Sequence, residues 1–224
     1  WGSTFVIVQD AISFLTPFSF NAIRFFIAFV ILLSIYMIFT KKDKLHFTKD
    51  SIKSGFVIGT WLCFGYGLQT FGLLYTTPAK AGFITGLSVV LVPLFSFLLL
   101  KYALNRNIIL GVIFAAAGLY MMTTMQTSSF SIGDFLVLLC AVSFAMHIIM
   151  TSKYAAKHHA MPLTILQIGV VSLLSFIGSL LFEEPSKMYR LDVLLQPEVV
   201  IGLLVTAILA TAFAFLAQTY FQAY

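Results

Sequence analysis

The sequence predicts an all-α, polytopic membrane protein organised as an inverted repeat of five-helix units. Two observations predict it: apolar segments of membrane-spanning length follow one another along the whole chain, and lysines and arginines fall mainly in alternate loops. Hydrophobic residues make up 60% of the 224 residues and charged residues only 9%, whereas charged residues are about a quarter of a soluble domain. A water-soluble globule is therefore excluded.

Eight apolar segments are expected to be helices. About 20 apolar residues cross a hydrocarbon core of roughly 30 Å as a helix, because lipid offers no partner to an unpaired backbone amide. Residues 87–100 are apolar on every side, whereas a barrel strand would alternate with a period of two, so helices are favoured over strands. The eight expected helices are residues 1–15, 18–40, 55–76, 78–100, 108–125, 133–152, 162–182 and 199–224.

The cationic loops predict how these helices are oriented, since short loops rich in Lys and Arg stay in the cytoplasm. Loops 15–17 and 126–132 carry no positive charge. Loop 183–198 carries acidic residues in addition to its positive ones. The second helix should therefore end on the cytoplasmic side. After five helices the chain is outside, so an internal repeat of five-helix units is inverted. The cations of the cytoplasmic loops are Lys41, Lys42, Lys44, Lys49, Lys53, Lys101, Arg106, Lys153 and Lys157.

The chain is expected to be an internal fragment of a longer protein. It does not begin with Met, the basic region of a secretory signal is missing, and Trp1 already lies inside an apolar segment too short to cross. The net charge of +5 is accounted for by loops that contact anionic lipid headgroups, so no nucleic-acid partner is expected.

Catalytic and metal-binding motifs are missing from the sequence. Cys63 and Cys140 fall inside expected helices with no Cys or His cluster, so neither a disulfide, a metal nor another cofactor is expected. No HExxH, GxSxG or GxxxxGK[ST] motif occurs. No catalytic residue is therefore assigned, and ATP coupling within this chain is disfavoured.

Polar side chains within the expected helices are the candidates for function, because an ionisable group near the bilayer centre costs at least ~2.5 kcal/mol. Asp10 and Arg24 lie at similar depth on either side of the turn at Thr16 and Pro17. They could form a pair. Arg24 is therefore either structural or a site for an anionic group.

Three further polar residues in the expected helices are candidates for function, and two of them have a structural and a functional interpretation. Gln69 lies at a similar depth in the third helix, and Lys80 in the first turn of the fourth either snorkels to the interface or binds a ligand. His147, four residues after Ser143, either bonds to a neighbouring helix or relays protons. Trp1 is a candidate for a cavity wall.

The residues resemble EamA-type permeases of the drug/metabolite transporter superfamily. The resemblance covers essentially the whole chain, and residues 79–87 with their continuation to Pro93 are its most specific part. The other matching stretches are residues 1–5, 24–28, 67–69, 133–134 and 141–147.

The resemblance implies ten helices in two inverted repeats of five. In this chain the first repeat is expected over residues 1–125, with a truncated start, and the second over residues 133–224, without its last two helices. It implies cytoplasmic termini and a multi-pass protein of the cell inner (plasma) membrane that exports or imports amino acids, related metabolites or drugs. Family members often carry an acidic residue after the fourth helix, where this chain has Lys101 and Tyr102. A role for that acid is not expected here.

The leading hypothesis is a secondary transporter, not an enzyme, that moves a small solute across the lipid bilayer by alternating access. A homodimer is one assembly that the hypothesis allows. An intramembrane enzyme and a non-transporting scaffold or sensor are the alternatives. The substrate-binding candidates are Trp1, Arg24, Gln69, Lys80 and Thr85, and the coupling candidates are Asp10 and His147.

Overall fold

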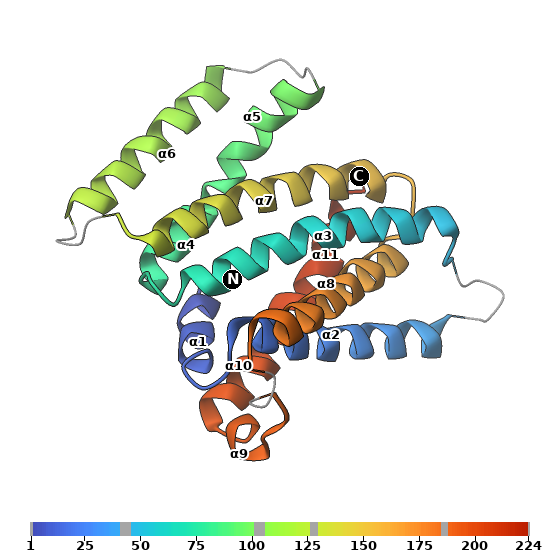
Figure 1. Cartoon of the computed structure of the whole chain (residues 1–224). Coiled ribbons are helices and arrows are strands. Elements are labelled where there is room, and N and C mark those ends of the chain that lie inside the picture. The colour runs from blue at the N-terminus through green and yellow to red at the C-terminus, as the bar shows by residue number, and fades with distance from the viewer. Residues whose placement is uncertain (1, 41–45, 101–105, 126–129, 185–187, 224) are drawn as a thin grey trace.

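Helices form the whole framework of the computed structural model, which describes residues 2–40, 46–100, 106–125, 130–184 and 188–223 (Figure 1). Strands do not occur in these ranges. The helices are α1 Thr4–Ala11, α2 Pro17–Phe39, α3 Lys49–Gly72, α4 Pro78–Gly86, α5 Ser88–Leu100, α6 Arg106–Met125, α7 Ile132–Ala155, α8 Ala160–Phe182, α9 Leu191–Leu194, α10 Pro197–Ala207, the π-helical segment η3 Ile208–Phe213, and α11 Ala214–Phe221.

The prediction of an all-helical, polytopic membrane protein is confirmed. Each of the eight expected segments contains helix, and within the described ranges five stretches are long and apolar enough to cross a membrane. Their length matches the roughly 20 residues that a hydrocarbon core requires. The five stretches are Pro17–Phe39, Pro78–Leu99, Ile132–Ala155, Ala160–Phe182 and Pro197–Phe221.

The third helix begins earlier than the apolar pattern predicts, at Lys49 instead of residue 55. A capping box fixes this start: Thr48 Oγ1 accepts the backbone N–H of Ser51 at 3.1 Å, and Ser51 Oγ accepts that of Thr48 at 2.9 Å. Two polar turns therefore precede the apolar part. Hydropathy marks where a helix can lie in lipid, not where its hydrogen bonding begins.

Two expected helices are interrupted. The helix expected over 78–100 breaks at Leu87, between α4 and α5, next to Gly86 and a few residues before Pro93 inside α5. A proline removes one helical hydrogen bond and its ring crowds the preceding turn. The helix expected over 199–224 contains η3, and such π-helical turns insert one extra residue and rotate everything after them.

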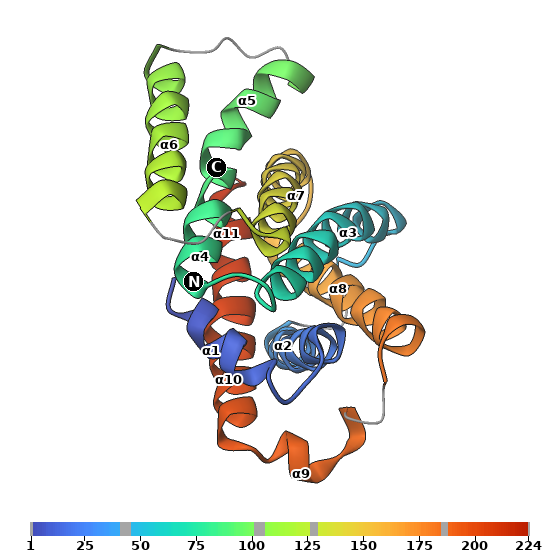
Figure 2. The same cartoon turned by 60° about the vertical axis from the view of Figure 1, so that its left-hand side comes forward.

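Four helices form the centre of the bundle. The helix α2 packs along α8, and α3 packs along both α7 and α8. The short α1 packs on α10, and α5 packs on α7, while α6 lies beside α5 at the outside of the bundle (Figure 2). The buried apolar side chains fall into one large cluster around α1, α10 and the start of α2, and another between α2, α3, α8 and α11.

Small residues allow the central helices to approach closely. A Cβ atom at Gly59 would lie 2.8 Å from the carbonyl oxygen of Gln167 in α8, and one at Gly133 would lie 2.6 Å from that of Gly72 in α3. Side chains larger than hydrogen do not fit at such distances. These contacts are the close helix packing that small residues provide where lipid removes the hydrophobic driving force between helices.

The two ends of the bundle differ in charge. At one end, which we call the basic end, the start of α3 meets the loop between α7 and α8, where His158 Nε2 lies 3.4 Å from Asp50 Oδ2 and 3.0 Å from Ser54 Oγ. At the opposite end, Glu183 accepts the backbone N–H groups of Phe18 and Ser19 at 2.7 and 3.0 Å. Residues 46–48 and 156–159 thus share one end, where the His46 and His159 rings stack, as the charge pattern predicts for the loops to which they belong.

Candidate functional site

A cavity of about 500 Å³ lies inside the bundle, between α1, α3, α4, α7 and α11, and we call it the central cavity. Aromatic rings and uncharged polar groups share its wall. None of its described lining residues is Asp, Glu, Lys or Arg. The aromatic part is formed by Phe5, Tyr66, Phe144 and Phe215, and the polar part includes Gln69, Thr85, Ser88, His147, Gln218 and Gln222.

Gln69 and Thr85 lie together in the wall of the central cavity. The Nε2 atom of Gln69 in α3 donates to Thr85 Oγ1 in α4 at 3.4 Å. Both side chains were singled out from the sequence as substrate-binding candidates, and the fold places them on the same cavity. Both side chains also interact with the buried thiol of Cys140. The remaining donor and acceptor capacity of the Gln69 amide and the Thr85 hydroxyl faces the cavity.

Gln222 lines the same cavity from the end of α11, with a buried oxygen that has no partner. Its Oε1 accepts no hydrogen bond from any described residue. A buried acceptor without a partner is unfavourable by about 1–3 kcal/mol. A solute that brings an N–H or O–H donor to this position would remove that penalty.

Arg24 lies behind the cavity wall instead of in it. Its side chain is only 2% exposed, its Nε donates to Thr211 Oγ1 at 2.8 Å, and its Nη2 donates to the Tyr66 hydroxyl at 3.4 Å. The guanidinium also lies over the Tyr66 ring, 4.7 Å from the centroid. Tyr66 therefore separates the cation of α2 from the central cavity.

The expected pair between Asp10 and Arg24 does not form. No carboxylate in the described ranges lies within 4.0 Å of the guanidinium, and Asp10 is exposed near the end of α1. An arginine without a carboxylate makes the region behind Tyr66 electropositive.

His147 joins a buried chain of hydrogen bonds beside the cavity. Its Nε2 lies 2.9 Å from Gln167 Oε1 and 3.3 Å from Thr151 Oγ1, while Gln167 Nε2 donates to Thr219 Oγ1 at 3.1 Å. Because the Gln167 oxygen is an acceptor, Nε2 of His147 is its donor. The histidine is thus hydrogen-bonded to Gln167 of the neighbouring helix α8, and it also lines the central cavity.

Lys80 does not line the central cavity. Its Nζ lies 3.4 Å from Asp134 Oδ2, and both side chains are buried. Asp134 also accepts the Ser131 backbone N–H at 2.9 Å and the Thr76 hydroxyl. Snorkelling to the interface is therefore wrong for Lys80, because its ammonium is held inside the protein between α4 and the start of α7.

The structure thus brings together three of the candidates, Gln69, Thr85 and His147, and holds Arg24 one side chain behind them. Asp10 and Lys80 lie elsewhere, and Trp1 lies outside the described residues, next to Gly2, which lines the cavity. The roles assigned to these residues stay predictions.

Sequence reasoning did not single out Tyr66, and it noted Asp134 as an acid at a helix start without giving it a role. One local signal existed for Asp134: Ser131 and Asp134 have the spacing of a capping box, which both side chains form in the structure. Tyr66 has no such signal, because aromatic residues occur throughout this chain and only the fold shows which of them stack on the cation.

Comparison with known proteins identifies relatives of the chain. The EamA-like transporter family matches residues 1–124. A protein of Archaeoglobus fulgidus named an uncharacterized transporter is 35% identical over 225 residues, covering 100% of this chain and 66% of its own length. The uncharacterized transporter YyaM of Bacillus subtilis is 27% identical, covering 86% of this chain and 65% of its own length.

The chain therefore spans slightly less than two thirds of the length of these relatives. A protein of known crystal structure has the same fold, with a TM-score of 0.67 over 99% of this chain and 77% of that one, at 19% sequence identity. That likeness concerns the fold alone.

Proposed function

The chain belongs to the EamA-like transporter family, and from this premise we propose that it is most of a secondary transporter that binds a small polar solute in the central cavity. The observation that carries the proposal is the cavity itself: polar groups of α3, α4, α7 and α11 line one space between apolar helices. Ligand sites are concave, mostly apolar and fitted with a few polar groups. We place the protein in the cell's plasma membrane.

The solute proposed here is a small molecule with an apolar or aromatic part and hydrogen-bonding groups. Its aromatic part would lie against Tyr66, Phe144 and Phe215, and a donor would reach Gln222. The positive charge of Arg24 behind Tyr66 favours an acidic or strongly electronegative group on that side. Amino acids and related carboxylates fit this description.

Alternating access between two inverted units is the proposed mechanism. The helix α3 packs along α7, and α1 packs on α10. The first contact joins the third and sixth expected membrane segments, and the second joins the first and eighth. If segment n of the first five-helix unit corresponds to segment n + 5 of the second, exchanging the two units converts one of these contacts into the other. Such paired contacts support rocking of one unit against the other about a central site. Repeat boundaries at 125 and 133 stay predictions.

Solute flux tests the proposal. The full-length protein in proteoliposomes should take up or release solutes from a panel of amino acids, carboxylates and aromatic amides, and Gln69→Ala should reduce flux about tenfold, as loss of one or two hydrogen bonds in a low-dielectric site predicts. Thr60→Ala is the matched control on α3, because the Thr60 hydroxyl donates only to the Phe56 carbonyl of its own helix at 2.8 Å.

Equal flux in the two variants would contradict the assignment of the central cavity. A solute that is chemically converted but not moved across the bilayer would instead support an intramembrane enzyme.

A further inference from the structure

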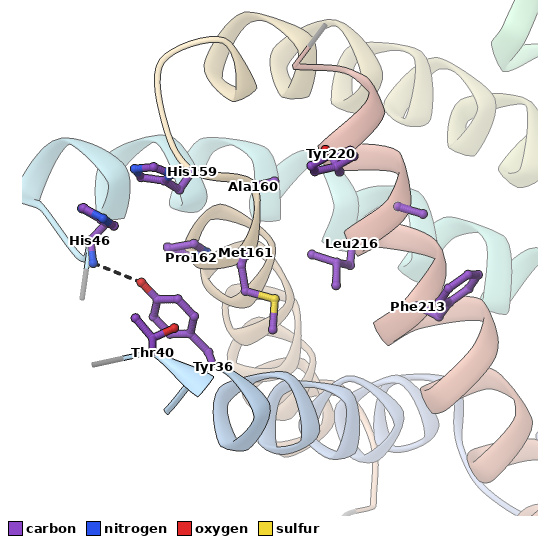
Figure 3. A pocket seen from close by; sticks show the side chains of 11 residues that line it. Tyr36, Thr40, His46, His159, Ala160, Met161, Pro162, Phe213, Leu216 and Tyr220 are labelled. Atoms are coloured by element: carbon purple, nitrogen blue, oxygen red, sulfur yellow. Dashed lines mark hydrogen bonds between the residues drawn. The ribbon is translucent and has the colours of Figure 1, made fainter. Parts of the chain in front are cut away.

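A second cavity, of about 550 Å³, lies at the basic end of the bundle (Figure 3). It is formed where α2 ends, α8 begins and η3 and α11 pass, and we call it the basic-end cavity. Among the described residues the two cavities share no lining side chain. Solute binding in the central cavity therefore does not explain why the basic-end cavity exists.

The basic-end cavity has a polar side and an apolar side. On the polar side the rings of His46 and His159 stack with centroids 4.1 Å apart, and the backbone N–H of His46 donates to the Tyr36 hydroxyl at 3.1 Å. Figure 3 shows Phe213 and Leu216 on the side away from these imidazoles. A ligand that fills this space must have a polar group at one end and an apolar body at the other.

The polar side favours negative charge. The helix α8 begins there at Ala160, and its N-cap His159 makes no side-chain capping bond. The backbone N–H groups of Ala160 and Met161 lie at the positive end of this 23-residue helix, and Pro162 has no N–H. The two stacked imidazoles of His46 and His159, whose ring nitrogens can donate hydrogen bonds, lie beside this end of the helix. No Asp or Glu occurs among the described lining residues.

The surroundings of the cavity match the inner surface of a bilayer. In the sequence, the four positions after Thr40, a lining residue, hold three lysines and one aspartate, a net charge of +2. Lysines next to a membrane helix attract anionic lipid by about 1 kcal/mol each. On the apolar side, Phe213 is 69% exposed and Tyr220 51% exposed, so this side is open to the surface of the helix bundle.

We propose that the basic-end cavity binds an acidic phospholipid of the cytoplasmic leaflet. The phosphate lies at His46, His159 and the start of α8, and an acyl chain lies against Phe213 and Leu216. Amphipathic shape, the positive helix end and the exposed apolar rim together select a lipid over a soluble anion, which would leave the apolar side empty.

Lipid retention by the full-length protein tests this proposal. Native mass spectrometry after release from nanodiscs containing equal amounts of phosphatidylglycerol and phosphatidylcholine with the same acyl chains should show about fivefold more phosphatidylglycerol retained. The double variant His46→Ala with His159→Ala should abolish this preference. Both histidines are exposed, so the variant is expected to fold.

A second pair of variants probes the apolar side. Leu216→Trp fills the cavity and should remove the retained lipid, whereas Leu181→Trp, at a 70% exposed position near the other end of α8, should not. Equal retention of the two lipids by the unmodified protein would overturn the proposal. So would a phosphatidylglycerol preference that survives both Leu216→Trp and the double histidine change.

Discussion

At the scale of single residues, the sequence indicates depth in the membrane but not partners. Gln69 and Thr85, both singled out from the sequence, meet in the central cavity. A pair with Asp10, on the neighbouring helix, was one interpretation of Arg24, but its Nε donates to Thr211, 187 residues further along the chain. No periodicity in the sequence shows such a contact, because Thr211 is presented by a π-helical turn.

The bond between Arg24 and Thr211 leads to the first stability prediction. Thr211→Val keeps the shape of the side chain and removes the acceptor, so a buried guanidinium N–H loses its partner. We expect the free energy of unfolding to fall by about 1–3 kcal/mol, measured as a lower melting temperature in detergent.

Thr206→Val is the matched control, since the hydroxyl of Thr206 donates only to the Gly202 carbonyl one turn earlier, at 2.6 Å. Equal melting temperatures for the two variants would contradict the importance of the Arg24 contact.

At the scale of helices, the sequence predicts that each apolar helix exists, but it does not predict where a helix is interrupted. The π-helical segment rotates α11, so that the buried face passes from Thr206 and Ala210 to Phe215 and Thr219. A row of residues spaced four apart would have continued through Ala214 and Gln218 instead. Hydrogen bonding within η3, which the pattern of side chains does not encode, decides this register.

A buried ion pair between Lys80 and Asp134 links α4 to α7. Asp134→Asn would leave the ammonium of Lys80, which is only 4% exposed, buried without its carboxylate. Removing one partner of a buried ion pair destabilises a protein by about 3–5 kcal/mol. We therefore expect a markedly lower melting temperature and yield for Asp134→Asn, and recovery of most of the loss when Lys80→Met is added.

The exposed pair of Arg190 and Asp192, with both side chains 61% exposed, provides the comparison. Asp192→Asn should leave the melting temperature unchanged, because exposed ion pairs contribute little. If Asp134→Asn behaved like Asp192→Asn, the buried pair would not hold α4 on α7.

At the scale of the whole molecule, composition and charge were enough to predict a polytopic helical membrane protein, because the cost of unpaired backbone in lipid leaves few other solutions. The arrangement of the basic loops agrees with the structure, where the segments around Asp50 and His158 are in contact. The central cavity could not be predicted. It depends on how Phe144, Phe215 and Tyr66 pack from three helices, and a single sequence does not encode that spacing.

The central claim is that the central cavity is the solute path, reached from either side of the membrane in turn. The most direct test places a cysteine at Thr85 in full-length protein with Cys63→Ala and Cys140→Ala, in sealed vesicles of one orientation. A membrane-impermeant thiol reagent should modify Thr85→Cys from each side, and transported solute should slow both reactions. Thr206→Cys, at a fully buried position, should stay unmodified. Modification from one side alone, with no effect of solute, would contradict the account.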